Sequence, residues 1–110
     1  MQIDVREDSG VVFIEPVGDI DGKTAPEMLD AVTNLVKPKA RIVLNMGRIA
    51  FMSSAGLRSM LLIYQQAKAK DAKVVLTGIN SDIRKSMSAT GFLAFFTVAE
   101  TVQDAVARVG

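Results

Sequence analysis

Two adjacent hydroxyl residues near the middle of the chain are the residues best placed to take part in chemistry. Ser53 and Ser54 follow the apolar run Ile49-Ala50-Phe51-Met52, which we expect to be buried, and they precede a long amphipathic pattern. A helix start offers unpaired backbone N–H groups and a partial positive charge. The position therefore suits a serine that caps the helix, and it also suits a phosphate group.

The residues that most enzymes use for acid–base or nucleophilic chemistry are missing from the chain. It contains no histidine and no cysteine, which excludes a Ser-His-Asp triad and a Cys-His nucleophile. A zinc site would have to use carboxylates alone, which is unusual. We therefore expect a protein that is not an enzyme and that uses no metal and no cofactor.

The composition predicts one domain over residues 1–110, with enough apolar residues for a core. A net charge of +1, with the charges well mixed, argues against direct binding to nucleic acid or a membrane surface. No apolar stretch approaches the ~20 residues that cross a bilayer. The first residues lack the apolar segment of a signal peptide, and the absence of cysteine fits a cytoplasmic protein.

Strand and helix patterns alternate along the chain. Ile3 and Val5 alternate with polar residues, which predicts a half-buried strand, and Thr24 with Glu27 forms a capping box before the first helix. The order β-β-α-β-α-β-α-β-α predicts an α/β fold with a mixed, mostly parallel sheet and about four helices. We expect strands at 2–6, 11–17, 41–45, 73–78 and 95–98, and helices at about 25–36, 54–70, 81–89 and after 100.

The helix that begins at the serines has a polar stripe with one leucine in it. At about 100° per residue, the core face carries Leu57, Met60, Leu61, Tyr64 and Ala67. Leu62 falls roughly opposite, in line with Ser54 and Arg58. Gly56 lies inside the first turn, where the missing side chain indicates close packing or the close approach of another molecule. We expect this stripe to be a contact surface for another protein.

A phosphate on Ser54 would change that surface without unfolding the domain. The helix start would stabilise the phosphate by about 0.3–1 kcal/mol, and Arg58 lies one turn further on. The modification would place close to two negative charges in the middle of the contact surface. An interface that fits a neutral hydroxyl would then lose affinity.

Four segments of the chain resemble the STAS domain family, and in particular its stand-alone anti-sigma factor antagonists. The resemblance covers essentially the whole chain, and its most specific part is the serine loop. The family's usual loop reads Asp-Ser-Ser/Thr-Gly-Leu, so Ser53 replaces the aspartate and Ala55 replaces the second hydroxyl residue. The matching segments are Gly18-Asp19-Ile20-Asp21, Ile42-Val43-Leu44-Asn45, Phe51-Met52-Ser53-Ser54-Ala55-Gly56-Leu57-Arg58 and Val74-Val75-Leu76-Thr77-Gly78.

The resemblance implies a STAS-like single domain that works as a switch in transcription control. Such antagonists bind an anti-sigma factor that is also a serine kinase (a GHKL-type ATPase), and this frees a sigma factor. The kinase phosphorylates the antagonist, and a PP2C-type phosphatase reverses the modification. On this match the acceptor is Ser54, with Ser53 as second choice. The implied partner-binding residues are Asp21, Ser53, Ser54, Ala55, Gly56, Arg58 and Leu62, with Asp21 equally well explained as a turn residue.

Two other functions remain open at this point. The missing aspartate favours a STAS scaffold or regulatory subunit of a larger assembly, of lipid-transport or stressosome type, without a phosphorylation cycle. A module that binds a nucleotide or small ligand has no specific support, because the chain contains neither a G-x-x-x-x-G-K nor a G-x-G-x-x-G motif.

Overall fold

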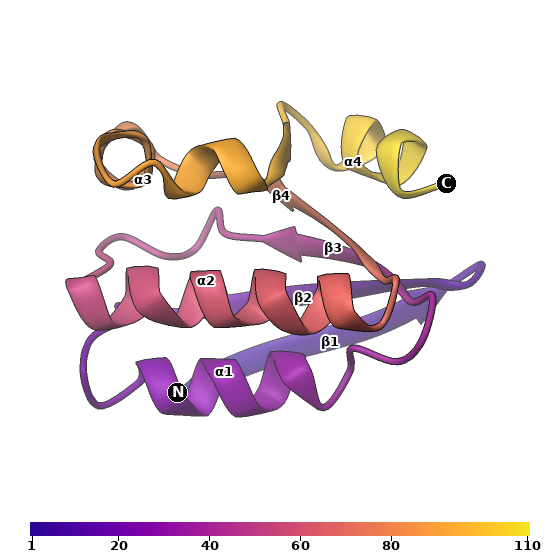
Figure 1. The fold of residues 1–110 in the computed structure, drawn as a ribbon, viewed down its shortest axis with the longest axis horizontal. Coiled ribbons are helices and arrows are strands. Elements are labelled where there is room, and N and C mark those ends of the chain that lie inside the picture. The colour runs from indigo at the N-terminus through magenta and orange to yellow at the C-terminus, as the bar shows by residue number, and fades with distance from the viewer.

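A computed structural model describes all 110 residues as one five-stranded sheet flanked by helices (Figure 1). The strands lie side by side in chain order, and the predicted element order is confirmed. The strands are β1 (Gln2–Asp8), β2 (Val11–Val17), β3 (Arg41–Asn45), β4 (Lys73–Thr77) and β5 (Thr97–Ala99). The helices are α1 (Ala25–Thr33), α2 (Ser54–Ala69), α3 (Ser81–Ala89) and α4 (Val102–Val109), with a 3₁₀ turn η1 (Phe92–Phe95).

The sheet is mixed because its first two strands form a hairpin. β1 pairs antiparallel with β2 across a tight turn in which Ser9 and Gly10 both have positive φ, as a primed hairpin turn requires. β2, β3, β4 and β5 pair in parallel, each through a helical crossover. β5 is short and pairs only with Val75, Leu76 and Thr77, so the first residues of β4 lie at an open edge of the sheet.

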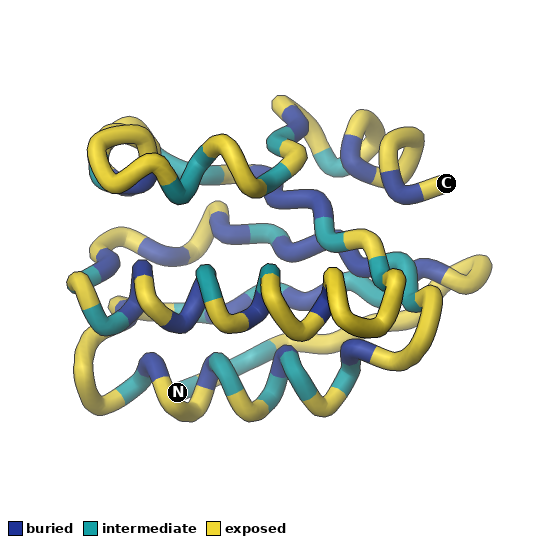
Figure 2. The backbone as a smooth tube through the Cα atoms, in the orientation of Figure 1, coloured by how far each residue is buried: buried dark blue, intermediate teal, exposed yellow.

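The helices cover both faces of the sheet, which divides the core into two clusters. Ile42 and Leu44 of β3 join a large cluster with α1, α2 and α3, whereas Val43 between them joins a smaller cluster with α4. This alternation follows from the two-residue period of a strand. Figure 2 shows the buried residues of the helices facing inward and the exposed residues facing solvent. None of the helices has the length and apolar character needed to cross a membrane.

Several local expectations prove wrong. Val5 is exposed rather than half-buried, because β1 is an edge strand of which only Ile3 packs against the core, together with Met1 just before the strand. The Thr24–Glu27 capping box does not form, because the Glu27 carboxylate instead pairs with the N-terminal ammonium at 2.6 Å. The first helix ends at Thr33, before the predicted residue 36. The predicted strand 95–98 is replaced by η1 and the shorter β5.

Gly56 lets α2 begin in close contact with the rest of the core. It is buried, and a Cβ atom at this position would lie 2.5 Å from Met52 Cγ and 2.8 Å from Ile20 Cγ2. Ile20 is fully buried and branched at Cβ, so it cannot easily move aside. Of the two explanations offered by the sequence, the structure supports close packing within the chain.

We predict that Gly56→Ala destabilises the protein, although alanine is normally the better helix residue by about 1 kcal/mol. The added methyl group overpacks the contact with Ile20, which costs about 1–3 kcal/mol and outweighs the propensity gain. Urea unfolding should show a net loss of about 1 kcal/mol, and at most about 2 kcal/mol. Gly22→Ala is the matched control, because no atom lies within 4 Å of its would-be Cβ. A Gly56→Ala variant as stable as the parent would contradict the packing role.

Candidate functional site

Two loops that are far apart in the sequence are joined at the end of the molecule that carries the serines. Ile20, before α1, forms an isolated parallel bridge with Met52, before α2. The Ile20 N–H donates to the Phe51 carbonyl at 2.8 Å, and the Ser53 N–H donates to the Ile20 carbonyl at 2.8 Å. This pairing fixes the backbone on either side of the serines and places Asp21 directly after the bridge.

Ser53 is the N-cap of α2, as predicted. Its backbone is extended, with φ −78° and ψ 176°, and its side-chain oxygen accepts from the Gly56 N–H at 3.4 Å. The residue is half-buried. Its hydroxyl is therefore already engaged in holding the first turn of the helix.

Ser54 is the first residue of α2 and differs from Ser53 in both exposure and bonding. The residue is exposed, and its hydroxyl has no hydrogen-bond partner within the chain. Arg58 and Leu62 follow at successive turns and are also exposed, Leu62 to 37%. The stripe expected on the outer face of the helix is thus present, with a free hydroxyl, a cation and an apolar side chain.

Asp21 lies beside the serines but uses one carboxylate oxygen to build its own loop. Its Oδ1 accepts from the Lys23 N–H at 2.9 Å, the Thr24 N–H at 3.0 Å and the Thr24 hydroxyl at 3.2 Å. The backbone N–H groups of Thr24 and Lys23 hold the pKa of Asp21 below its usual value by stabilising the carboxylate. The residue therefore has the turn role that the sequence allowed, and its second oxygen makes no hydrogen bond within the chain.

Ala55 and Gly56 complete the set of predicted contact residues, and only one of them reaches the surface. Ala55 is half-buried, whereas Gly56 is buried beneath the serines. Gly56 therefore allows close packing beneath the serines and is not a contact residue for a partner.

Phe51 was expected in the core but is 54% exposed. Met52 next to it is buried, and in an extended segment neighbouring side chains point to opposite sides. Phe51 therefore points outward beside the serines, next to a hollow of about 230 Å³ that α3 lines with Asp82, Ile83 and Ser86. The sequence missed this residue because its apolar type indicated burial. No local signal could have found it, because the side of this segment that faces the core is fixed by the bridge to the distant Ile20.

Asn80 ties the same loop to α3. Its amide nitrogen donates to the carbonyls of Ile49 at 3.3 Å and Ala50 at 3.0 Å, while its Oδ1 accepts from the Ile83 N–H at 2.8 Å. The side chain thus caps α3 and anchors the chain just before Phe51. Local sequence can indicate only the capping role, because the second set of partners comes from a distant loop.

Comparison with known proteins is consistent with this arrangement. The family model described as STAS domain matches residues 2–105. A curated relative of Bordetella bronchiseptica, named "Putative anti-sigma factor antagonist BtrV", is 28% identical over 108 residues, covering 97% of this chain and 93% of the relative.

Solved structures agree with the fold over nearly the whole chain. An anti-sigma factor antagonist from Mycobacterium paratuberculosis superposes with a TM-score of 0.81 at 26% identity, covering 98% of this chain and 92% of that one. The phosphorylated form of the Bacillus cell fate determinant SpoIIAA gives a TM-score of 0.73 at 20% identity, covering 99% and 100% of the two chains.

We predict that Asn80→Ser lowers the free energy of unfolding by about 1–2 kcal/mol, because serine keeps the cap but cannot reach the two carbonyls. Asn80→Ala should cost roughly 1 kcal/mol more, since the cap is also lost. Chemical denaturation measures both values. Asn34→Ser is the matched control, because the exposed Asn34 side chain has no partner in the structure. If Asn80→Ser and Asn34→Ser have the same small effect, the tie contributes nothing to stability.

Proposed function

The chain belongs to the STAS domain family, and we propose that it acts as an anti-sigma factor antagonist in the cytoplasm. In this proposal it binds an anti-sigma factor through a serine surface, formed by Asp21, Phe51, Ser53, Ser54, Arg58 and Leu62, and so releases a sigma factor. It acts by binding and catalyses no reaction. Phosphorylation of one serine by the anti-sigma factor, which is also a GHKL-type kinase, ends the binding, and a PP2C-type phosphatase restores it.

The different states of the two serine hydroxyls carry this proposal. Ser53 is half-buried and caps α2, whereas Ser54 is exposed and its hydroxyl is free of partners. A kinase needs an accessible hydroxyl, and modification of Ser53 would also remove a cap worth about 1 kcal/mol. These observations favour Ser54 as the acceptor. Ser53 also places a capping oxygen at the position where the family's usual loop has its aspartate.

The surroundings of Ser54 allow a phosphate without loss of the fold. The first turn of α2 contains no acidic residue, and the helix start favours negative charge. Arg58 has no ion-pair partner in the structure, so its guanidinium is free to approach a phosphate one turn away. The modification therefore acts on the surface, where nearly two new negative charges would have to be desolvated by a partner.

The described functions of the relatives also support this proposal. The curated relative and the Mycobacterium structure are both described as anti-sigma factor antagonists. SpoIIAA, whose fold this chain shares, has been solved in unphosphorylated and phosphorylated forms.

We predict that Ser54→Ala binds the anti-sigma factor at least as well as the parent and cannot be phosphorylated, whereas Ser54→Asp binds at least tenfold more weakly, about 1.4 kcal/mol. Incubation with ATP and a candidate anti-sigma factor kinase of the same organism, followed by mass spectrometry, locates the phosphate. Titration calorimetry measures the affinities. Ser53→Ala is the control, and it should remain a substrate while losing about 1 kcal/mol of stability.

A phosphate found on Ser53 instead would contradict the assignment of the acceptor. A stable complex in which neither serine is ever modified would show that the chain is a scaffold rather than a phosphorylation switch.

We further predict that Phe51→Ala weakens anti-sigma factor binding by about tenfold or more, because an exposed aromatic residue is a typical interface anchor. Its stability should change by less than the ~3–5 kcal/mol that removing a core phenylalanine costs. Val5→Ala is the control, since Val5 is an apolar residue of similar exposure, 50%, that lies on β1 and belongs to neither proposed contact surface. Equal effects of the two variants on binding would show that Phe51 is not part of the interface.

A further inference from the structure

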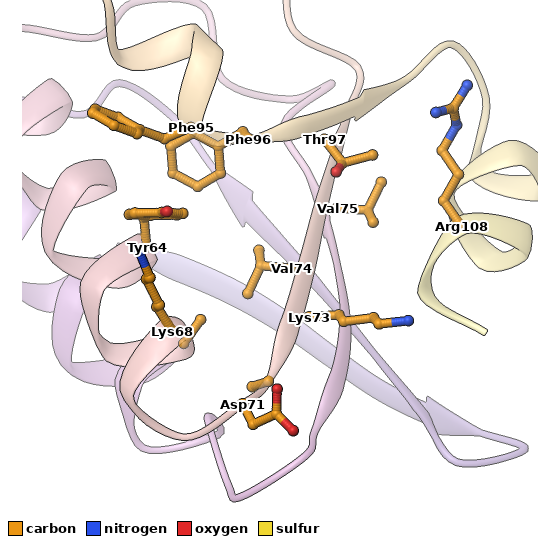
Figure 3. Close-up of a pocket in the computed structure, with 12 residues that line it drawn as sticks. Tyr64, Lys68, Asp71, Lys73, Val74, Val75, Phe95, Phe96, Thr97 and Arg108 are labelled. Carbon is orange, nitrogen blue, oxygen red and sulfur yellow. The ribbon is translucent and has the colours of Figure 1, made fainter.

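A hollow of about 390 Å³ lies away from the serine surface and opens to solvent. Figure 3 shows it around the first residues of β4, with Tyr64 and Lys68 of α2 on one side and Arg108 of α4 on the other. It exists because β5 begins beside Val75, which leaves the edge of β4 uncovered before that residue. We call this hollow the basic groove.

The middle of the basic groove is apolar and partly aromatic. Tyr64 stacks on Phe95 with ring centroids 5.1 Å apart, and Phe96 meets Tyr64 edge-on at 5.8 Å. Phe95 remains 47% exposed although it has this partner. The floor is formed by small and branched apolar residues, namely Ala67, Ala72, Val74 and Val75. An apolar side chain of a ligand would find a fixed aromatic wall and a shallow floor here.

The rim of the basic groove is positively charged. Lys68, Lys73 and Arg108 come from three different elements, and they are opposed by a single acid, Asp71. None of the three cations forms a salt bridge within the chain. The chain as a whole carries a net charge of only +1, so this excess is local. The groove is therefore complementary to a ligand with several negative charges.

The backbone of β4 adds a directional polar group. The Lys73 N–H donates to the Ala40 carbonyl on the β3 side. Because successive residues of a strand direct their backbone groups to opposite sides, the Val74 N–H points away from β3, into the region that β5 does not reach. A ligand with a backbone carbonyl could accept this hydrogen bond as an added strand does.

We propose that the basic groove binds an extended acidic peptide segment of a partner protein, with one apolar or aromatic residue placed against Tyr64 and Phe95. A small carboxylate fits less well, because small-ligand sites bury most of their ligand whereas this groove lies along the uncovered edge of β4. The three cations are also spread over α2, β4 and α4, which suits charges distributed along a chain. This second contact surface does not depend on the function proposed for the serine surface.

The single tyrosine of the chain gives a direct readout of this site. Tyr64 is the only tyrosine and there is no tryptophan, so tyrosine fluorescence reports on the basic groove alone.

The probes are short synthetic peptides in which glutamates flank one central leucine or phenylalanine, and the same peptides with glutamine in place of glutamate. We expect the acidic peptides to change Tyr64 emission and to shift the amide NMR signals of residues 73–75, with a Kd of roughly 0.1 mM. The glutamine peptides should bind at least tenfold more weakly, and added salt should weaken the acidic ones.

Matched variants locate the binding. Lys73→Gln and Arg108→Gln should each raise the Kd several-fold, and Phe95→Ala should raise it for the phenylalanine peptide. Lys23→Gln removes the same charge at the serine-bearing end and should leave the Kd unchanged. All four side chains are more than a third exposed, so the fold should be retained, which thermal unfolding verifies.

Three results would overturn the proposal. The first is that no acidic peptide shifts a groove signal at millimolar concentration, or that acidic and glutamine peptides bind equally. The second is that sodium benzoate binds as tightly as the peptides, which would make the groove a small-carboxylate site. The third is a concentration-dependent dimer, seen by light scattering, that Phe95→Ala abolishes, which would make a second copy of this chain the occupant.

Discussion

The backbone pairing of Ile20 with Met52 is the constraint on which the serine-bearing end depends. It joins the loop before α1 to the loop before α2 through two hydrogen bonds of 2.8 Å, and buried Ile20 closes the core beneath it. Gly56 makes the pairing possible, because a side chain there would collide with both bridge residues. The roles of the neighbours follow from it. Because Met52 points into the core, its neighbour Phe51 points outward. Because the Ser53 hydroxyl caps the helix, the Ser54 hydroxyl is the first one that is free.

The two surfaces described here differ in chemistry and lie at different positions along α2. The serine surface combines a neutral hydroxyl with exposed apolar groups, so a phosphate would change it strongly. The basic groove carries unpaired cations around an aromatic pair. From Ser54 to Tyr64 the helix rises about 15 Å, whereas charges in physiological salt are screened over about 8 Å. A phosphate on Ser54 would therefore leave the groove largely unaffected, and the two surfaces could be occupied independently.

The sequence predicts those features that depend on local patterns. The element order, the bounds of α3, the Ser53 cap and the exposed stripe of Ser54, Arg58 and Leu62 are all confirmed. Features that depend on distant partners were missed or wrong. Glu27 binds the N-terminal ammonium instead of closing a capping box, and Asn80 binds carbonyls about thirty residues away. Phe51 was missed for another reason. Residue type alone does not say which side of an extended segment faces the core.

The most direct test is a hydrogen-exchange footprint of the chain with and without an anti-sigma factor kinase of the same organism, the partner that the proposed function requires. We predict protection of residues 50–62 and of the loop around Asp21, and no protection there once the chain has been phosphorylated. Protection confined to β5, α4 and the end of α2, with the serine surface unchanged, would contradict it.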